Sequence, residues 1–348
     1  MIFAAMLFAV ATPERSVGGP VSPKRSVGAW TPQTTGTTAR LRGVSAVSDT
    51  VAWASGTGGT VLRTVDGGRT WRTLSVPGAA SLDFRDIDAI SERIAYVLSI
   101  GSGDASRIYK TSDGGSTWDL QFSSGDPREF FDAMAFWDAD RGVAFSDSID
   151  GQFVILVTRD GGRTWSRVPK EALPAALRNE GAFAASGTNV AVFGHDLVWI
   201  GTGAASRSRV LRSVDGGRTW AVADTPLASG PSSGIFSIAF ADSRNGIVVG
   251  GDYKKDLESG HHAAITSDGG HTWSPAALSG FRSVVAAVPG ASRSWLAVGP
   301  SGSDVSTDGG RTWTQIDGPG FHSFSFARGS TKTGWGVGER GAVARFEW

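Results

Sequence analysis

The octapeptide Thr64-Val65-Asp66-Gly67-Gly68-Arg69-Thr70-Trp71 decides the fold, because five near-copies of it follow along the chain. Every copy satisfies the pattern [S/T]-x-D-G-G-x-T-W. Repetition on this scale indicates an array of one supersecondary unit. The copies are Thr111–Trp118, Thr158–Trp165, Ser213–Trp220, Thr266–Trp273 and Ser306–Trp313.

The spacing of the copies predicts the blades of a β-propeller. Successive Asp residues of the octapeptides are 47, 47, 55, 53 and 40 positions apart, and short apolar runs separated by turn residues fill each interval. Four short strands in a repeat of this length are typical of a propeller blade. The chain has 348 residues, of which 40% are hydrophobic, and this is enough for one large all-β domain.

The chemistry of the octapeptide predicts a structural role. Asp-Gly-Gly is a hairpin turn signal, and the Thr and Trp that follow it favour a strand. We expect the motif to join the third and fourth strands of a blade, with its indole between neighbouring blades. One carboxylate per turn supplies too few oxygen ligands for calcium. The residues expected at these corners are Asp66, Trp71, Asp113, Trp118, Asp160, Trp165, Asp215, Trp220, Asp268, Trp273, Asp308 and Trp313.

The octapeptide resembles the Asp box, also called the bacterial neuraminidase repeat, and the resemblance covers residues 30–348. Asp boxes occur in sialidases, some xyloglucanases, sortilin-type receptors and the photosystem II stability/assembly factor-like family. Segments such as Val51–Gly56 and Gly334–Gly338 make the chain most similar to the last of these families. That resemblance implies a seven-bladed propeller and a role as a binding scaffold. It does not carry over a photosystem partner, because nothing in the sequence indicates a photosynthetic membrane.

A count of strands predicts how the ring closes. Six octapeptides account for six four-stranded blades, and three further strands are expected at Phe321–Phe326, Gly334–Gly338 and Ala342–Phe346. The segment that begins Ala29-Trp30-Thr31 resembles the Trp-led strand that follows each octapeptide. We therefore expect the N-terminal strand to complete blade seven, which removes the exposed sheet edges. Residues 29–348 then form a single propeller domain.

The N-terminal segment predicts export. Residues 1–11 are apolar and resemble the core of a secretory signal, with Ala9-Val10-Ala11 as a small-residue cleavage site, although the usual positively charged start is missing. Residues 12–28 are typical of a flexible linker. We therefore expect a periplasmic or secreted protein. No other stretch approaches the length of a transmembrane span.

The composition argues against several function classes. Lys plus Arg equals Asp plus Glu, 33 against 33, which gives no general reason to expect nucleic acid as a partner. The absence of cysteine excludes thiolate catalysis and Cys-ligated metals. Gly201–Ser206 comes close to a dinucleotide-binding fingerprint, but strand and turn residues follow where a helix is needed. His261 and His262 are adjacent and point to opposite faces of a strand, so we expect no metal site there. We also expect no cofactor, and we expect the protein to be a monomer.

Unequal loops predict where function lies. Blades one, six and seven have short connections, whereas blades two to five carry Ser99–Arg107, Ser146–Gln152, Gly194–Ser208 and Gly250–Ala263. Long insertions on one side of a regular scaffold commonly hold the binding site. The residues expected to form a binding surface there are Arg85, Asp86, Phe131, Asp132, Asp147, His195, Trp199, Asp252, Tyr253 and Lys254.

Two classes of function remain open. The first is a non-catalytic propeller that holds a protein or peptide on its loop face. The second is a glycoside hydrolase that uses Asp132, Asp147 or Asp252, with a carbohydrate as ligand. A sialidase is disfavoured because the expected Arg-Ile-Pro segment is absent, and the most similar segment is Arg93-Ile94-Ala95. A xyloglucanase-like enzyme would be expected to use two propellers, and an oxidoreductase lacks a recognisable cofactor motif.

Overall fold

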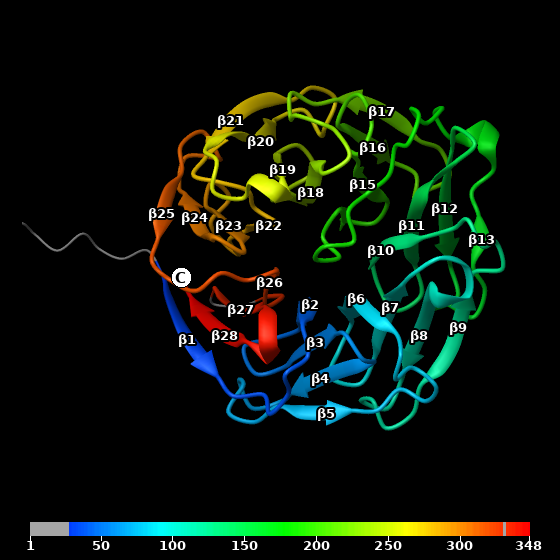
Figure 1. Ribbon diagram of the computed structural model, residues 1–348, viewed down its shortest axis with the longest axis vertical. Coiled ribbons are helices and arrows are strands. Elements are labelled where there is room, and N and C mark those ends of the chain that lie inside the picture. Colours follow the sequence, from blue (N-terminus) through cyan, green and yellow to red (C-terminus); the bar gives the residue numbers. More distant parts are fainter. Residues whose placement is uncertain (1–27, 330–331) are drawn as a thin grey trace, which may run out of the picture.

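The computed structural model describes residues 28–329 and 332–348, and the predicted signal segment lies outside them. Within the described residues, the strands form seven antiparallel sheets of four strands each, arranged as a ring (Figure 1). The predicted fold class, a seven-bladed all-β propeller, is confirmed. None of the described helices is long and apolar enough to cross a membrane.

The strands of each blade follow one another in sequence from the centre of the ring outward, except in blade seven. Blade one contains β2 (Leu41–Ala46), β3 (Ala52–Gly56), β4 (Thr60–Thr64) and β5 (Arg72–Leu74). Blade two contains β6 (Asp83–Ala89), β7 (Ala95–Ile100), β8 (Arg107–Thr111) and β9 (Asp119–Ser123). Blade three contains β10 (Phe131–Phe136), β11 (Gly142–Ile149), β12 (Gln152–Thr158) and β13 (Ser166–Arg167). Blade four contains β14 (Val190–Phe193), β15 (Leu197–Gly201), β16 (Arg209–Ser213) and β17 (Ala221–Asp224).

The remaining blades have the same plan. Blade five contains β18 (Ser233–Phe240), β19 (Gly246–Asp252), β20 (Gly260–Thr266) and β21 (Ser274–Leu278). Blade six contains β22 (Val284–Ala287), β23 (Trp295–Gly299), β24 (Gly302–Ser306) and β25 (Thr314–Ile316). Blade seven contains β26 (Ser323–Phe326), β27 (Thr333–Val337), β28 (Val343–Glu347) and β1 (Ala29–Gln33). Single 3₁₀ turns are η1 (Gly103–Ala105), η2 (Lys170–Ala172), η3 (Tyr253–Lys255) and η4 (Glu339–Gly341).

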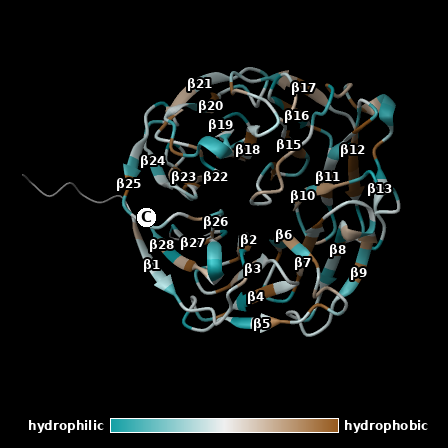
Figure 2. Cartoon of the chain, viewed as in Figure 1, coloured by the Kyte–Doolittle hydropathy of each residue, from teal (hydrophilic) through white to brown (hydrophobic). Residues whose placement is uncertain are grey.

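Burial follows the position of a strand in its blade. All five residues of β3 are buried, whereas two of the three residues of β5 are exposed. Figure 2 shows the same gradient, with hydrophilic residues on outer strands such as β5 and β25. The second strands of the blades, such as β3 and β7, pack against neighbouring blades on both faces and are buried along most of their length rather than in strict alternation.

Each octapeptide forms the corner between the third and fourth strands of its blade, as predicted. The Thr64 hydroxyl accepts a hydrogen bond from Gly68 N (2.9 Å) and donates to Asp66 Oδ1 (2.8 Å). Asp66 also accepts from the backbone N–H of Thr70 (2.9 Å) and from its hydroxyl (2.7 Å). These two Thr70 donors lower the pKa of Asp66 to about 2. The other five octapeptides make the same bonds.

Seven hydrophobic clusters fill the interfaces between neighbouring blades, and each cluster includes one Trp from the start of an outer strand. Six of these Trp residues end the octapeptides, and the seventh is Trp30. Aromatic residues contribute large buried areas, so these interfaces supply much of the hydrophobic stabilisation of the ring. In order of the interfaces from one–two to seven–one, the residues are Trp118, Trp165, Trp220, Trp273, Trp313, Trp30 and Trp71.

The N-terminal strand closes the ring as predicted. β1 pairs with β28 from Ala29 opposite Glu347 to Gln33 opposite Val343. The Trp30 ring lies 4.7 Å from the rings of both Phe321 and Phe346. Gln33 Oε1 accepts hydrogen bonds from the indoles of Trp71 and Trp335, both at 3.1 Å, and its amide donates to Gly67 O at 2.9 Å. One side chain thus joins blade seven to the first octapeptide.

One predicted loop is wrong. Gly194–Ser208 was expected to be a single insertion, but its middle part is strand β15, which pairs with β14 and β16. The apolar run Leu197–Ile200 has glycines at positions 194 and 201 on its two sides. A short apolar run bounded by such turn residues is typical of a buried strand. The connection between the second and third strands of blade four is therefore shorter than predicted.

Removal of the closing strand should unfold the ring. Deletion of residues 29–38 removes one of the two partners of β28, which then pairs only with β27, and opens the cluster around Trp30, so we expect no cooperative folding. The milder change Trp30→Ala should lower the free energy of unfolding by about 2–4 kcal/mol. Thermal and urea denaturation measure this, with the exposed neighbour Thr31→Ala as control. Equal stability of the deletion variant and the full chain would contradict closure by β1.

The octapeptide carboxylates should make stability depend on pH in acid. Because the folded-state pKa of Asp66 lies below its unfolded value of about 3.8, its contribution is present above pH 4 and is lost as the pH falls toward 2. Asp66→Ala should therefore melt at a lower temperature than the wild type at pH 7, and the difference should vanish toward pH 2. Asp119→Ala, an exposed carboxylate on β9, is the control. A difference that stays constant with pH would contradict the assignment.

Candidate functional site

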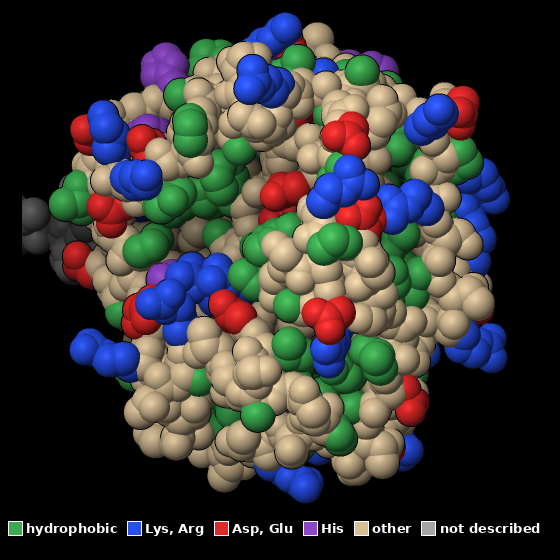
Figure 3. All heavy atoms as spheres, turned by 45° about the vertical axis from the view of Figure 1, so that its right-hand side comes forward, with side chains coloured by type: hydrophobic (Ala, Val, Ile, Leu, Met, Phe, Trp, Pro, Cys, Tyr) green, Lys and Arg blue, Asp and Glu red, His purple; other side chains and the backbone are tan. Residues whose placement is uncertain are grey.

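A cavity of about 470 Å³ opens at the centre of the ring, on the face opposite the octapeptides. In an antiparallel meander, the connections between strands two and three and those between blades lie at the same end, and they surround this opening. Figure 3 shows hydrophobic side chains around the hollow and charged side chains near its rim. We call this space the central cavity. It is lined by Arg42, Arg85, Ile100, Phe130, Asp132, Asp147, Ala182, Phe183, Ala184, Ala185, Phe236, Tyr253, Phe281, Ser283, Pro300 and His322.

Several of these side chains reach the cavity because the innermost strands carry β-bulges. The register between β2 and β3 shifts from Leu41 to Gly43, which leaves Arg42 out of the ladder. Arg85, Asp132 and Phe236 occupy the same position in β6, β10 and β18. A bulge redirects the side chain of the extra residue and is common near binding sites. The fold therefore offers equivalent positions in several blades at the mouth of the channel.

Blades seven, one and two supply the cationic groups. The Arg85 guanidinium donates to Asp83 Oδ2 (2.8 Å) and to Ala184 O (2.7 Å). Arg42 differs, because its buried Nε has no hydrogen-bond partner among the described residues. Burial, together with the neighbouring Arg85, lowers the pKa of Arg42 to about 10. We call Arg42, Arg85 and His322 the cationic sector.

His322 contributes a largely neutral imidazole to this sector. Its Nε2 lies 2.7 Å from Glu339 Oε1, and its Nδ1 is buried without a partner in the described part of the chain. Burial lowers the pKa of His322 more than the Glu339 carboxylate raises it. The cationic sector thus holds two guanidinium groups and one ring nitrogen that has no protein partner.

Blade three supplies two carboxyl groups, Asp132 on β10 and Asp147 on β11. The two groups are hydrogen-bonded to each other, and Asp147 Oδ1 also accepts from Ala182 N (3.1 Å). Burial raises the pKa of Asp147 to about 6, and burial together with the nearby Asp147 raises the pKa of Asp132 well above its usual range. Two carboxyl groups this close share one proton near neutral pH. We call them the acidic pair.

Blades four to six supply an aromatic surface. The rings of Phe183 and Phe236 stack, with centroids 4.1 Å apart. Tyr253 packs edge-on against both rings at 6.5 and 6.1 Å, and Phe281 packs edge-on against Phe236 at 4.7 Å. Such a surface binds apolar side chains and the stems of long polar ones.

The structure brings four of the predicted binding residues to the central cavity: Arg85, Asp132, Asp147 and Tyr253. Asp252 and Lys254 flank Tyr253, and the Asp252 carboxylate caps η3 by accepting a hydrogen bond from Lys254 N at 3.0 Å. The pKa of Asp252 is lowered mainly by that bond. Asp252 is therefore engaged in local structure and is separate from the acidic pair.

The other four predicted residues do not line the cavity. His195 lies in the turn between β14 and β15, at the octapeptide end, where its carbonyl accepts from Arg141 (2.8 Å). Trp199 is buried between blades four and five, stacked on Phe240 at 3.6 Å. Phe131 is buried against Phe122. Asp86 is buried and accepts from Met134 N (2.7 Å), which ties blade two to blade three.

Several lining residues were not predicted from the sequence, and some of them carry a signal in it. Three blades begin with the same short pattern: a hydrophobic residue, then any residue, then a small or polar residue. The three segments are Leu41-Arg42-Gly43, Phe84-Arg85-Asp86 and Phe321-His322-Ser323. The middle residue of each triplet lines the cavity. Phe183 has no such signal, because it lies in the irregular segment before β14.

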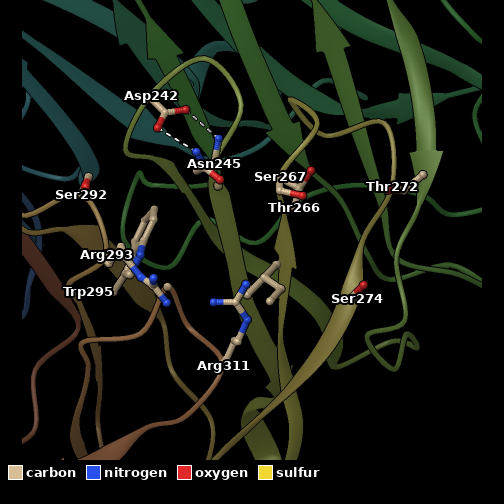
Figure 4. A pocket seen from close by; sticks show the side chains of 13 residues that line it. Asp242, Asn245, Thr266, Ser267, Thr272, Ser274, Ser292, Arg293, Trp295 and Arg311 are labelled. Atoms are coloured by element: carbon tan, nitrogen blue, oxygen red, sulfur yellow. Dashed lines mark hydrogen bonds between the residues drawn. The ribbon is translucent and has the colours of Figure 1, made fainter.

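A second cavity, of about 700 Å³, lies between blades five and six on the octapeptide face (Figure 4). In blades one and two the equivalent groove is covered by a cation over an aromatic ring, Arg63 over Trp53 and Lys110 over Tyr96. Blade five has paired isoleucines, Ile247 and Ile265, at those positions. The groove is open because these shorter side chains do not span it. Its exposed arginines, Arg293 and Arg311, both donate to Asp308 O.

The comparisons with known proteins agree with the fold. No family model and no curated protein matches the chain. The structure of YCF48 bound to a D1 peptide aligns at 18% identity over 92% of this chain and 97% of that one, with a TM-score of 0.63. The GH74 enzyme of Niastella koreensis aligns at 17% identity over 90% of this chain and 53% of that one, with a TM-score of 0.61. U3-55K aligns at 14% identity over 92% and 98%, with a TM-score of 0.64. At these identities the similarity shows the propeller fold alone.

Proposed function

We propose that this chain is an exported, non-catalytic propeller that binds a protein or peptide segment in the central cavity. The observation that carries the proposal is the combination, in one cavity, of Arg42 Nε without a protein partner, a pair of carboxyl groups bonded to each other, and a stacked aromatic surface. Buried polar atoms are normally satisfied, so unpaired ones in a cavity point to a ligand that supplies the missing partners. An extended peptide offers both donors and acceptors.

Similarity supports the same proposal. YCF48 has been solved with a D1 peptide bound, and the octapeptide resembles the Asp box of the photosystem II stability/assembly factor-like family. We infer a scaffold role of that kind for this chain, with a partner that has still to be identified.

The carboxyl geometry gives the glycoside hydrolase alternative no support. Retaining and inverting glycosidases hold their two carboxyl groups about 5 Å and about 6.5–9.5 Å apart, with the sugar between them. Asp132 and Asp147 instead hydrogen-bond to each other. This chain also covers only 53% of the GH74 enzyme.

Arg42 provides a test that separates binding from stability. Arg42 is half-buried and its Nε has no partner among the described residues, which is unfavourable in the free protein, so Arg42→Gln should raise the free energy of unfolding by about 1–3 kcal/mol. The same change should weaken partner capture at least about tenfold, because the ligand loses its charged contact. Immobilised wild type and variant are compared on the exported fraction and by thermal melting, with Arg72→Gln on the outer strand β5 as control.

If Arg42→Gln captures the partner as well as the wild type does, the cationic sector is not part of the binding surface. Turnover of a glycoside by the wild type, abolished by Asp132→Asn, would replace the binding proposal with the enzyme alternative.

Export is part of the proposal and rests on residues 1–11, which resemble a signal core. Expression of the full chain in its native host should yield a mature protein outside the cytoplasm, with its N-terminus after Ala11. Cell fractionation and N-terminal mass spectrometry measure this. A cytoplasmic protein that retains Met1 would contradict export.

A further inference from the structure

We propose that the acidic pair, Asp132 and Asp147, receives a cationic side chain of the peptide partner, the ammonium of a Lys or the guanidinium of an Arg. This inference rests on the proposed function and names the chemistry of the residue that enters the central cavity. The chemical requirement is a donor of several hydrogen bonds that carries positive charge, reaches the inner end of the cavity and has a long apolar stem.

The position of the two carboxyl groups supports this assignment. Asp132 is only 1% exposed but still lines the cavity, so it lies at the inner end of the space. Among the described residues, the Asp147 carboxyl is the one hydrogen-bond partner of the Asp132 carboxyl. Asp147 is the more exposed member, and it is held in place by Ala182 N. A ligand cation that approaches Asp147 from the cavity can donate hydrogen bonds to the acidic pair, which has no cationic partner in the described chain.

The protein supplies no cation of its own to the pair. No salt bridge joins either carboxyl group to a Lys, Arg or His of the described chain, and no basic side chain contributes to the pKa of either group. The charged neighbours are occupied elsewhere. Glu180, on the segment that packs over Asp147, is bonded to Arg209 (2.9 Å), and Arg85 on β6 is bonded to Asp83. On β2, Arg42 belongs to the cationic sector, which leaves the acidic pair available to a ligand.

The aromatic surface fits the stem of such a side chain. Phe183 lies directly after Ala182, whose N–H binds Asp147, and its ring stacks on Phe236. A Lys or Arg that follows these rings toward Asp147 buries its methylene groups against them and keeps its charge near aromatic rings, where a cation is further stabilised. An acid side chain in the same place would meet two carboxyl groups and be repelled.

The protonation state of the pair gives the site a pH response. Near neutral pH the two carboxyl groups share one proton and carry a single negative charge. Because the pKa of Asp147 is about 6, the pair becomes neutral below that pH and its attraction for a cation falls. We therefore expect affinity to drop about tenfold per pH unit between pH 6 and pH 5 and to change little between pH 7 and pH 8.

The test uses a displayed library of random peptides selected on the full propeller. Peptides selected by the wild type should share a Lys or Arg at one position, and its replacement by norleucine or citrulline should weaken binding about 10- to 100-fold. Asp132→Asn/Asp147→Asn keeps the size and hydrogen bonding of the pair, and it should no longer select for a cation. Asp150→Asn, exposed in the turn that follows β11, is the matched control and should select as the wild type does.

The outcomes separate this inference from the proposed function. If the library yields binders without a shared cation, or if the double Asn variant binds the Lys or Arg peptides as tightly as the wild type, the inference is wrong and peptide binding stands. If no peptide is selected by the folded wild type, the proposed function itself fails. Thermal melting shows whether each variant is folded, and Asp147→Asn alone replaces the double variant if that one does not fold.

Discussion

The pairing of β1 with β28 is the interaction on which the rest of the structure depends. A propeller blade cannot bury both of its faces alone, so each needs a neighbour on either side, and the ring supplies this only when it is closed. Here the first and last strands of the described chain meet in one sheet, and Trp30 fills the blade six–seven interface as the octapeptide indoles fill the others. Gln33 extends the closure to Trp71 and Trp335, so that blades seven and one are joined by hydrogen bonds as well as by packing.

The octapeptides explain why one face of the ring is free for binding. Each carboxylate of the motif accepts hydrogen bonds from donors of its own turn, as Asp66 does from Thr70. These bonds hold the corner rigid and occupy the acceptors that a ligand would need. At the other end no such motif exists, and the innermost strands begin with bulges that point Arg42, Arg85 and Asp132 into the channel mouth. The scaffold is thus fixed at one end and varied at the other, a division that suits a repeat protein with a binding role.

The fold could be predicted closely from the sequence, because the Asp-Gly-Gly turn and the Trp after it have strong local preferences and recur six times. The closing strand followed from the likeness of Trp30 to those Trp residues. The site was harder to predict. Loop length pointed to Asp147, which lines the central cavity, but it also pointed to His195 and Trp199, which do not, since the boundary of β15 was missed. Bulges depend on the register between two strands, which a single sequence does not display, and Phe183 reaches the cavity through an irregular segment with no periodic pattern.

The central cavity holds opposite charges that do not neutralise each other, and this arrangement needs an explanation in physical terms. Arg42 and the acidic pair are both partly desolvated, and each is less favourable in its charged form than it would be in water. A protein evolving for stability alone would pair these groups or replace them with apolar residues of similar size. They come instead from separate blades, aromatic rings complete the cavity, and no salt bridge joins them in the described chain. The cost in the free protein becomes a gain when a ligand contacts both, because the desolvation of the protein groups has already occurred and each new contact forms in a medium of low dielectric constant. A partner with an acceptor for the cationic sector and a cation for the acidic pair therefore gains more from this cavity than a uniformly charged or apolar one.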